Sequence, residues 1–502
     1  MLLDLPRSGG PLYRRIYLAL KTSIRDGRLN PGARLPSTRT LAADLGVSRN
    51  SVMLAYEQLA AEGYVVNRDR SAASVAETQP ALRAASRPHP VKPARAVLST
   101  YGRFLLEQLP TPPSSTYALR PGLRYDFRYG RPSPHDFPRE LWRRLLVERL
   151  RRGSSESTGY GPPSGYEPLR AALKDYVGRA RGISCDIEQI VIVSGSQQAF
   201  DILARLLINP GDAVAIEEPN YPGLALPFAA AGARLLPVPV DGEGLDPARL
   251  PSPNAGARAV CVSPCHQFPT GVVMPVARRM ALLDWAERAG AWVVEDDYAS
   301  ELRYAGRPIE ALQALDRDDR VIHVGTFSKT LLPALRLAYV VLPRSLVAPF
   351  VSAKWLADRY TAMLGQEALT DFIARGHFER YLRRACTRNA ARRQVLVESL
   401  QRHFGDGIEI AGENAGVHLL VWLKGVKPHD LPHLIARAEH GGVGLYSAAP
   451  FYSTPPKRAG LLFGYAALTE TEIRAGIRKL ATIVERSGGG HDRLDRSDRK
   501  IN

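Results

Sequence analysis

The stretch that decides the fold is the pair Trp292-Val293-Val294-Glu295-Asp296-Asp297-Tyr298 and Val321-Ile322-His323-Val324-Gly325-Thr326-Phe327-Ser328-Lys329-Thr330. Each part begins with an apolar run of strand length and ends in polar residues. Similar apolar runs stand at 190–193, 213–216 and 259–262, with helical patterns between them. This alternation predicts a mostly parallel sheet covered by helices on both faces, which is an α/β body.

The rest of the chain divides around this body. A chain of 502 residues is too long for one core, so we expect two or three domains. Prolines crowd into residues 77–120, which indicates a linker with a short helix near 97–109. Two expected strands, Val417–Leu423 and Leu461–Tyr465, stand among helical patterns near the C-terminus. The expected boundaries are a head at 1–76, a flexible linker at 77–120, a body at 121–486 and a disordered tail at 487–502. Within the body we expect a large part at about 150–360 and a smaller α+β part at about 365–486.

The charge of the chain is concentrated at its N-terminus. The formal net charge is +17, and residues 1–100 hold 15 Lys/Arg against 7 Asp/Glu. A basic N-terminal module suggests a polyanion partner. No segment reaches the length of a membrane span, and the N-terminus has no apolar signal region. We therefore expect no membrane association.

The cysteines indicate a reducing environment, because Cys185, Cys261, Cys265 and Cys386 are too few and too scattered for a disulfide framework. This fits a cytoplasmic protein. Cys261 and Cys265 could be imagined as metal ligands, but no second Cys/His pair accompanies them. We interpret them as thiols of a strand and its exit loop, and expect no metal.

The head has the pattern of three helices and a strand. Leu12, Ile16, Leu20 and Ile24 have helical spacing. Ser37 and Ser48 are typical N-caps of two further helices, and 64–66 reads as a strand. This order predicts a winged helix-turn-helix. The first residues of a recognition helix reach base edges, and helix N-termini favour phosphate. The expected DNA contacts are Arg34, Ser37, Thr38, Arg39, Ser48, Arg49, Asn50 and Ser51.

The run LPSTRTLAADLGVSRNSV at 35–52 resembles the DNA-binding head of GntR-type bacterial regulators, and the likeness covers most of the head. The resemblance implies a double-stranded DNA operator as partner. One departure concerns the wing, whose tip usually carries glycines in that family. Here the tip is Asn67-Arg68-Asp69-Arg70-Ser71, in which Arg68 and Arg70 could still touch phosphate or the minor groove.

The polar residues after the strands of the body match the needs of pyridoxal 5'-phosphate (PLP). Lys329, on a turn of small residues, is an amine for the cofactor's aldehyde. A carboxylate must hold the pyridine nitrogen protonated, and strand alternation allows only one of Asp296 and Asp297 to face it. We favour Asp296, with Tyr298 then able to reach the phenolic oxygen.

Three further contacts complete this expected site. Ser194-Gly195-Ser196-Gln197 follows a strand and opens a helix, so its N–H groups and hydroxyls converge on an anion. Arg336 is a cation for the cofactor's phosphate, and Tyr221 is a ring that could stack on the pyridine.

Residues 125–485 resemble fold-type I aminotransferases, through SGSQQAFDIL, EEPNYPG, FPTG, EDDY and GTFSKTLLPALR. The resemblance implies the same roles for Ser196, Gln197, Tyr221, Asp296, Tyr298, Lys329 and Arg336. It also implies a homodimer, in which Tyr160 reaches the phosphate site of the neighbouring subunit. A GntR-type head before such a body is the architecture of the MocR/GabR subfamily, which SPCHQFPTGVVMP at 263–275 also resembles. The expected fold class is thus a winged helix-turn-helix, mainly α, before an α/β PLP-dependent transferase of fold type I with a smaller α+β domain.

Two departures from the aminotransferase pattern bear on function. Phe268 stands before Pro-Thr-Gly, where those enzymes commonly have an asparagine that bonds the phenolic oxygen. Leu462 stands where they have the arginine that pairs the substrate carboxylate, and an apolar residue cannot do this. Other candidates for that carboxylate are His266, Arg303 and Arg131.

Three hypotheses follow from these residues. The first is a PLP-dependent transcriptional regulator whose effector is an amine, an amino acid or PLP itself, with little or no turnover of ordinary amino acids. The second is an active aminotransferase with a fused DNA-binding domain. The third is a DNA-binding scaffold with a dead cofactor site, against which the intact set of Lys329, Asp296 and Arg336 argues.

Overall fold

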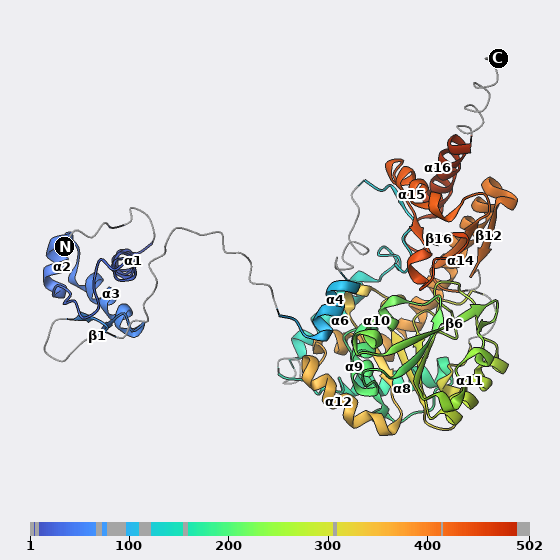
Figure 1. Cartoon of the computed structure of the whole chain (residues 1–502), viewed down its shortest axis with the longest axis horizontal. Helices are drawn as coiled ribbons and strands as arrows, with labels where there is room; N and C mark the ends of the chain where they lie inside the picture. The colour runs from blue at the N-terminus through green and yellow to red at the C-terminus, as the bar shows by residue number, and fades with distance from the viewer. Residues whose placement is uncertain are drawn as a thin grey trace, which may run out of the picture. The chain divides into compact units, whose positions relative to one another are not determined.

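The chain forms two compact units in a computed structural model, Met1–Val97 and Leu98–Asn502, here called the head and the body (Figure 1). The structure describes residue 5 and residues 10–66, 73–77, 97–109, 122–153, 159–304, 309–412 and 415–488. The wing tip with Arg68 and Arg70 lies outside the described residues, as do 78–96 and 110–120 of the expected linker, residue 121 of the expected body and 489–502 of the expected tail. The division at Val97 falls within the linker expected at 77–120.

The head is a three-helix unit with a two-stranded antiparallel wing. Its elements are α1 (Leu12–Arg25), α2 (Thr38–Leu45), α3 (Arg49–Ala61), β1 (Val65–Val66) and β2 (Ser74–Val75). The expected apolar stripes form its core, in which Ile16, Leu20, Leu41, Val52 and Leu59 are fully buried. Burial of these stripes, rather than helix propensity alone, holds the three short helices together.

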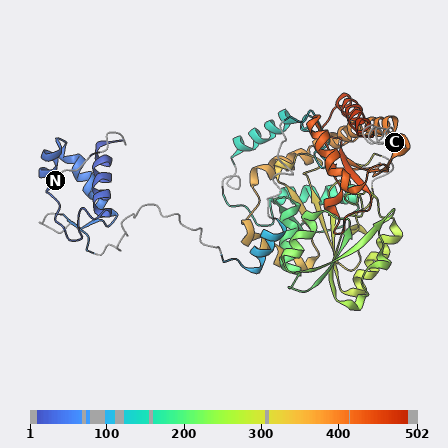
Figure 2. The ribbon, with the colours of Figure 1, turned by 45° about the horizontal axis from the view of Figure 1, so that its top comes forward.

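The body is built on an eight-stranded sheet (Figure 2). In spatial order its strands are β4 (Ile190–Val193), β11 (Ala338–Val341), β10 (Val321–Thr326), β9 (Trp292–Asp297), β8 (Ala257–Val262), β5 (Ala213–Glu218), β6 (Arg234–Asp241) and β7 (Gly244–Leu245). Pairing is parallel from β10 through β6, and β11 and β7 run antiparallel to their neighbours. The prediction of a mostly parallel sheet is confirmed.

Successive residues of the strands point to opposite faces, and helices cover both. Val191 and Val193 pack with α9 (Ser196–Leu207), α10 (Pro222–Ala230) and α12 (Arg344–Asp358). Ile190 and Ile192 pack on the other face with α6 (Arg139–Arg152), α8 (Glu167–Arg181), α13 (Met363–Ala374) and the start of α14 (His377–Phe404). Val293 lies in a third cluster with α11 (Val276–Ala289). Because both faces are covered, the strands read as continuous apolar runs in the sequence.

The smaller part of the body gathers at one end of it (Figure 1). Its four-stranded sheet has the order β12 (Ile408–Ala411), β13 (His418–Leu423), β16 (Ala459–Gly464) and β15 (Tyr446–Ser447). Helices α15 (Leu431–His440) and α16 (Glu470–Gly488) belong to this part, together with the paired strands β3 (Tyr125–Asp126) and β14 (Val443–Gly444). Because α16 runs to Gly488, it extends two residues into the tail expected from Ser487.

Some elements carry weak sequence signals. Helix α4 (Thr100–Gln108) was expected near 97–109, whereas β6 and β11 were not singled out. Strand β6 contains Pro237 and Pro239, which normally argue against a strand. Both prolines are in register with β5, and the other neighbour of β6 is only the short β7. Strand β6 is thus close to the sheet edge, where missing N–H donors are tolerated.

Candidate functional site

The expected DNA contacts lie around the starts of α2 and α3. Ser37 Oγ accepts a hydrogen bond from the Thr40 N–H at 3.1 Å, and Ser48 Oγ accepts one from the Ser51 N–H at 3.2 Å. Both predicted N-caps are therefore confirmed. Side chains of Arg34, Ser37, Arg39, Ser48, Arg49 and Asn50 are exposed, and those of Thr38 and Ser51 are partly buried. The Arg49 Nε donates to Thr38 Oγ1 at 3.3 Å, which joins the start of α3 to that of α2.

Lys329 stands three residues after the end of β10 and lies against a glycine that sequence reasoning missed. Its Nζ donates to the Gly130 carbonyl at 2.9 Å. A Cβ added at Gly130, where φ is 70°, would stand 3.0 Å from that nitrogen. Burial lowers the pKa of Lys329, an effect that the nearby Asp296 carboxylate opposes. A deprotonated amine is the nucleophile that an aldehyde requires, so this environment suits covalent capture.

The two aspartates at the end of β9 face opposite sides of the sheet. Asp297 shares its side with Val293 and forms a buried ion pair with Arg181 Nη2 at 2.7 Å. Asp296 shares its side with Val294, which packs with α9. Burial, and then the charge of Asp297, raises the pKa of Asp296 to about 7, while Lys329 lowers it. Asp296 is therefore the carboxylate that faces the lysine.

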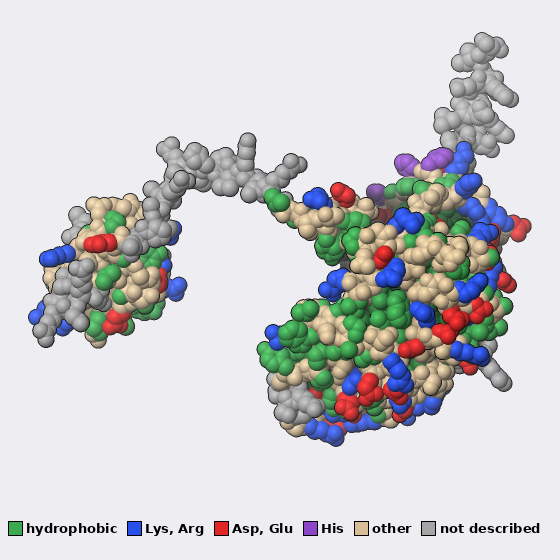
Figure 3. All heavy atoms as spheres, turned by 60° about the horizontal axis from the view of Figure 1, so that its bottom comes forward, with side chains coloured by type: hydrophobic (Ala, Val, Ile, Leu, Met, Phe, Trp, Pro, Cys, Tyr) green, Lys and Arg blue, Asp and Glu red, His purple; other side chains and the backbone are tan. Residues whose placement is uncertain are grey.

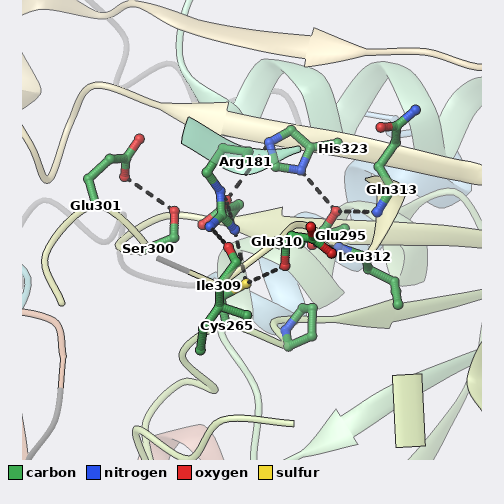
Figure 4. A network of polar contacts seen from close by, with 12 residues as sticks. Arg181, Cys265, Glu295, Ser300, Glu301, Ile309, Glu310, Leu312, Gln313 and His323 are labelled. Carbon is green, nitrogen blue, oxygen red and sulfur yellow. Dashed lines mark hydrogen bonds and ion pairs between the residues drawn. The ribbon is translucent and has the colours of Figure 1, made fainter. Parts of the chain in front are cut away.

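Arg181, Glu295 and His323 belong to a network of polar contacts at β9 (Figure 4), and Arg181 binds Asp297. His323 Nδ1 lies 2.9 Å from Glu295 Oε2, and Glu295 also accepts from the backbone of Leu312 at 2.7 Å. Arg181 donates from Nε to Asp297 at 2.9 Å and bonds the Ile309 carbonyl. Burial alone would raise the pKa of Asp297, but Arg181 and then His323 hold it below its ordinary value. Asp297 thus stays ionised and engaged on the side away from Lys329.

The turn that opens α9, predicted to bind the cofactor's phosphate, is closed on one side by Arg336. Its Nη2 donates to the Ser194 carbonyl at 2.8 Å. A Cβ added at Gly195 would lie 2.4 Å from the same nitrogen, so only glycine allows this approach. Arg336 itself has φ of 50°, a conformation that is uncommon outside glycine and is concentrated at functional positions. The N–H groups of Ser196 and Gln197 open the helix beside this guanidinium.

Aromatic residues gather beside the lysine. Tyr221 lies 5.8 Å, centroid to centroid, from Phe268, which in turn lies 6.2 Å from Tyr298. Leu462 on β16 is fully buried in the same cluster, together with Phe451. Leu462, which stands where aminotransferases have the arginine that pairs the substrate carboxylate, is therefore packed among apolar side chains.

The other predicted residues lie differently. Gln197 is exposed and donates to the Gly223 carbonyl at 2.9 Å. Tyr160 is 85% exposed and packs against Tyr360 of its own chain, not with the group around Lys329. The predicted contact of Tyr160 with the phosphate site of a neighbouring subunit stays a prediction.

Of the alternative carboxylate partners, His266 is neutral and Arg131 lies near a carboxylate, whereas Arg303 Nε is buried without a hydrogen-bond partner among the described residues. His266 bonds Tyr298 and the backbone, and burial lowers its pKa to about 4, so it carries no charge at neutral pH. Arg131 Nη1 lies 3.8 Å from Asp126. The backbone of Arg303 pairs with that of Ala415. His266 therefore offers a carboxylate no positive charge at neutral pH.

Sequence reasoning missed three contributors, Gly130, Arg181 and His323. Gly130 is distant from Lys329 in the chain, and Arg181 ends a helix without any motif. His323 reads as one residue of an apolar strand, and its charged partners come from other elements. No local signal could have found them.

Comparison with known proteins gives the class to which this architecture belongs. Residues 12–75 match the gntR family of bacterial regulatory proteins, and residues 138–480 match aminotransferase class I and II. The fold resembles Pyrococcus horikoshii kynurenine aminotransferase, solved with PMP, at 29% identity and a TM-score of 0.67, over 78% of this chain and 95% of that one. It also resembles the α-aminoadipate aminotransferase LysN of Thermus thermophilus, at 28% identity and a TM-score of 0.66, over 78% and 95% of the two chains.

Full-length relatives combine both parts. The chain is 37% identical to the probable rhizopine catabolism regulatory protein MocR of Rhizobium meliloti, over 95% of each chain. It is 32% identical to the transcriptional regulator TauR of Rhodobacter capsulatus, over 95% of this chain and 98% of that one. A pyridoxine biosynthesis regulator, PdxR of Corynebacterium glutamicum, is 28% identical over 96% and 99%. The chain belongs to the MocR/GabR subfamily of GntR-type transcriptional regulators, with an aminotransferase-like body of fold type I.

Proposed function

We propose that the chain is a PLP-dependent transcriptional regulator, in which the head binds an operator and the body senses an effector through PLP bound at Lys329. The observation that carries this proposal is the pairing of Lys329 with Asp296 beside an arginine-closed anion cradle, in a chain with a GntR-type head. Gly130 and Gly195, which both have positive φ, let the Lys329 and Arg336 head groups approach the backbone closely, which fits a cofactor held by backbone and cations.

Each residue of the site has a role in this proposal. Lys329 bonds the aldehyde, and the Asp296 carboxylate holds the pyridine nitrogen protonated. Ser196 and Gln197, at the start of α9, and Arg336 hold the phosphate, and Tyr221 stacks on the ring. PLP supplies an electrophilic carbon that amines attack, so the natural effectors are an amine, an amino acid or free PLP itself.

Absorbance and operator binding together test the proposal. Purified protein with added PLP should show a visible band that borohydride fixes onto Lys329, and PLP or an amine should change operator affinity about 5- to 150-fold, the usual range of coupling between sites. A protein that stays colourless with PLP would contradict the cofactor role. Operator binding that ignores every tested ligand would contradict sensing.

Turnover of ordinary amino acids is the second candidate function, and the intact Lys329, Asp296 and Arg336 favour it. Leu462 opposes it, because the fully buried leucine offers no charge to a substrate carboxylate. A steady-state screen of amino donors separates the two functions, since repeated turnover with keto-acid product would support an enzyme. We expect little or none.

Substitution of Arg49 tests the head separately from the body. Arg49→Ala should weaken operator binding roughly 5- to 150-fold, the cost of one bidentate base contact, and leave the visible cofactor band unchanged. Fluorescence anisotropy with labelled operator at fixed salt measures this. Arg25→Ala, an exposed arginine at the end of α1, is the control and should bind nearly normally. Equal losses in both variants would mean that only overall charge matters.

A homodimer is part of the proposal, because large apolar side chains are exposed on α4, α6 and α12. Leu106, Leu150 and Leu356 are 62%, 62% and 76% exposed. Hydrophobic side chains also gather on the side of the body shown in Figure 3 where Figure 1 places α4 and α12. If a second subunit covers this apolar face, the exposed Tyr160 would lie close to the PLP site of that subunit.

Light scattering after size exclusion tests the dimer. Leu356→Glu should shift the protein toward monomer, because it places a charge in the buried face. Val276→Glu, at an apolar residue of α11 that is 64% exposed, is the control and should remain dimeric. A wild-type protein that is monomeric at micromolar concentration would contradict the dimer.

The part of the chain that the structure describes contains no helix long and apolar enough to cross a membrane. The proposal places the regulator in the cytoplasm, where its operator would be.

A further inference from the structure

His266 is held rigidly beside the cofactor residues. Its Nε2 lies 3.0 Å from the Ala415 carbonyl oxygen, and its Nδ1 lies 2.6 Å from the Tyr298 hydroxyl. A Cβ added at Gly416, where φ is 83°, would stand 2.6 Å from the imidazole ring. The ring is therefore clamped between a backbone acceptor and one phenol.

The Ala415 carbonyl and the Tyr298 hydroxyl determine which ring nitrogen of His266 carries a proton. A carbonyl oxygen can only accept, so the Nε2 of His266 carries the ring proton. Burial lowers the pKa of His266 to about 4, so the imidazole is neutral and its Nδ1 is a lone pair. The Tyr298 hydroxyl has one hydrogen, and it must donate that hydrogen to Nδ1.

We infer that His266 is a positioning residue that holds the hydroxyl proton of Tyr298 away from the phenolic oxygen of PLP. The inference rests on the proposed cofactor roles of Lys329 and Tyr298. Tyr298 then offers only lone pairs to that oxygen. Phe268, which lies 6.2 Å from Tyr298 between ring centroids, has no donor to replace it.

The consequence concerns the Schiff base at Lys329. Hydrogen bonds donated to a phenolate oxygen stabilise the deprotonated form and lower the pKa of the conjugate. Because neither Tyr298 nor Phe268 donates a hydrogen bond to the phenolic oxygen, the Schiff base at Lys329 keeps its proton to higher pH. The Schiff base then stays protonated, and open to attack by an amine, over the whole neutral pH range, which suits recognition of an amine ligand.

Several other titratable groups lie near enough to this pair to influence its titration. They lie on the neighbouring strands, on the small-part sheet and after β10, and they are Asp296, Asp297, Glu217, Tyr465, His418 and Lys329. These groups are the same in every variant of Tyr298 and His266. Their effect on the titration midpoint therefore stays nearly constant when the variants are compared.

The test is a pH titration of the visible band in the full-length protein loaded with PLP. Tyr298→Phe alone should leave the midpoint nearly unchanged, because the lost hydroxyl donated to His266. His266→Phe should lower the midpoint by about one pH unit or more, since the released hydroxyl then donates to a charged oxygen. The double variant should return to the wild-type midpoint.

His266→Asn is the matched control, because its amide oxygen can replace Nδ1 as the acceptor, and it should titrate like the wild type. A midpoint that rises by about one pH unit in Tyr298→Phe would overturn the inference, since Tyr298 would then be a donor to the cofactor. This single variant decides the matter even if His266→Phe does not fold. A wild-type protein without any visible band would instead contradict the proposed cofactor site.

Discussion

Lys329→Ala should abolish borohydride-fixed attachment of PLP and weaken its binding roughly 100-fold or more, equivalent to about 3 kcal/mol. The substitution removes the only atom of this turn that can bond an aldehyde. It also acts on Asp296, whose pKa of about 7 is lowered by the charge of Lys329. Without that charge the pKa of Asp296 rises further above its ordinary value, which weakens its hold on a protonated pyridine nitrogen.

Mass spectrometry of borohydride-treated peptides and a PLP titration followed by absorbance measure both effects. Lys424→Ala, at an exposed lysine of the smaller part, is the control and should keep wild-type labelling. Labelling of Lys329→Ala at another lysine with wild-type stoichiometry would show that the attachment site is misassigned. Operator binding without ligand should survive in Lys329→Ala, because the head is a separate unit.

Arg181→Met should destabilise the body by about 3–5 kcal/mol, the cost of removing one partner of a buried ion pair. Arg181 and Asp297 are 3% and 6% exposed, and Nη2 stands 2.7 Å from the carboxylate. Without Arg181 the Asp297 charge is left in a site that also holds Glu295 (Figure 4). Denaturant unfolding followed by tryptophan fluorescence measures the loss, and the five tryptophans all lie in the body.

Arg179→Met is the matched control, two residues earlier on the same helix. Its ion pair with Glu379 is on the surface, where Arg179 is 66% exposed, so its loss should cost less than about 1 kcal/mol. Equal effects of Arg179→Met and Arg181→Met would contradict a special role for the buried pair.

The deficit of Arg181→Met should also shrink as the pH falls. In the wild type the pKa of Asp297 lies below its ordinary value, so the pair's contribution is present above about pH 4 and lost as acid protonates the carboxylate. In the variant the buried carboxyl has a raised pKa and takes up a proton in the folded state. This proton uptake stabilises the folded variant as the pH falls. The unfolding free energies of the wild type and of Arg181→Met should therefore converge toward acid pH.

Much of the fold could be predicted because its signals are local. The helices of the head follow from residues such as Ile16 and Leu20 at helical spacing and from the N-caps Ser37 and Ser48. The central strands of the body follow from apolar runs, since both of their faces are buried. Strand β6 was missed because its prolines disguise it, and they are tolerated only because of its place near the sheet edge.

The candidate site divides in the same way. Lys329, Arg336 and the turn 194–197 were found because strand-to-helix and strand-to-loop transitions place such residues at ligand sites. The sequence favoured Asp296 over Asp297 but could not decide between them, since alternation says that they face opposite sides but not which side holds the lysine. The ion pair with Arg181 shows that Asp297 faces away from Lys329, so Asp296 is the aspartate on the side of the lysine.

By itself, the sequence determined the order of the head and body, the strands and helices, and the residue types that a PLP site requires, because periodicity and motifs are properties of neighbouring residues. Only the tertiary structure decided the electrostatics of that site. Gly130 against Lys329, Arg181 against Asp297 and His266 against Tyr298 are contacts between segments far apart in the chain. Protonation depends on burial and on nearby charges in space, which no local pattern records.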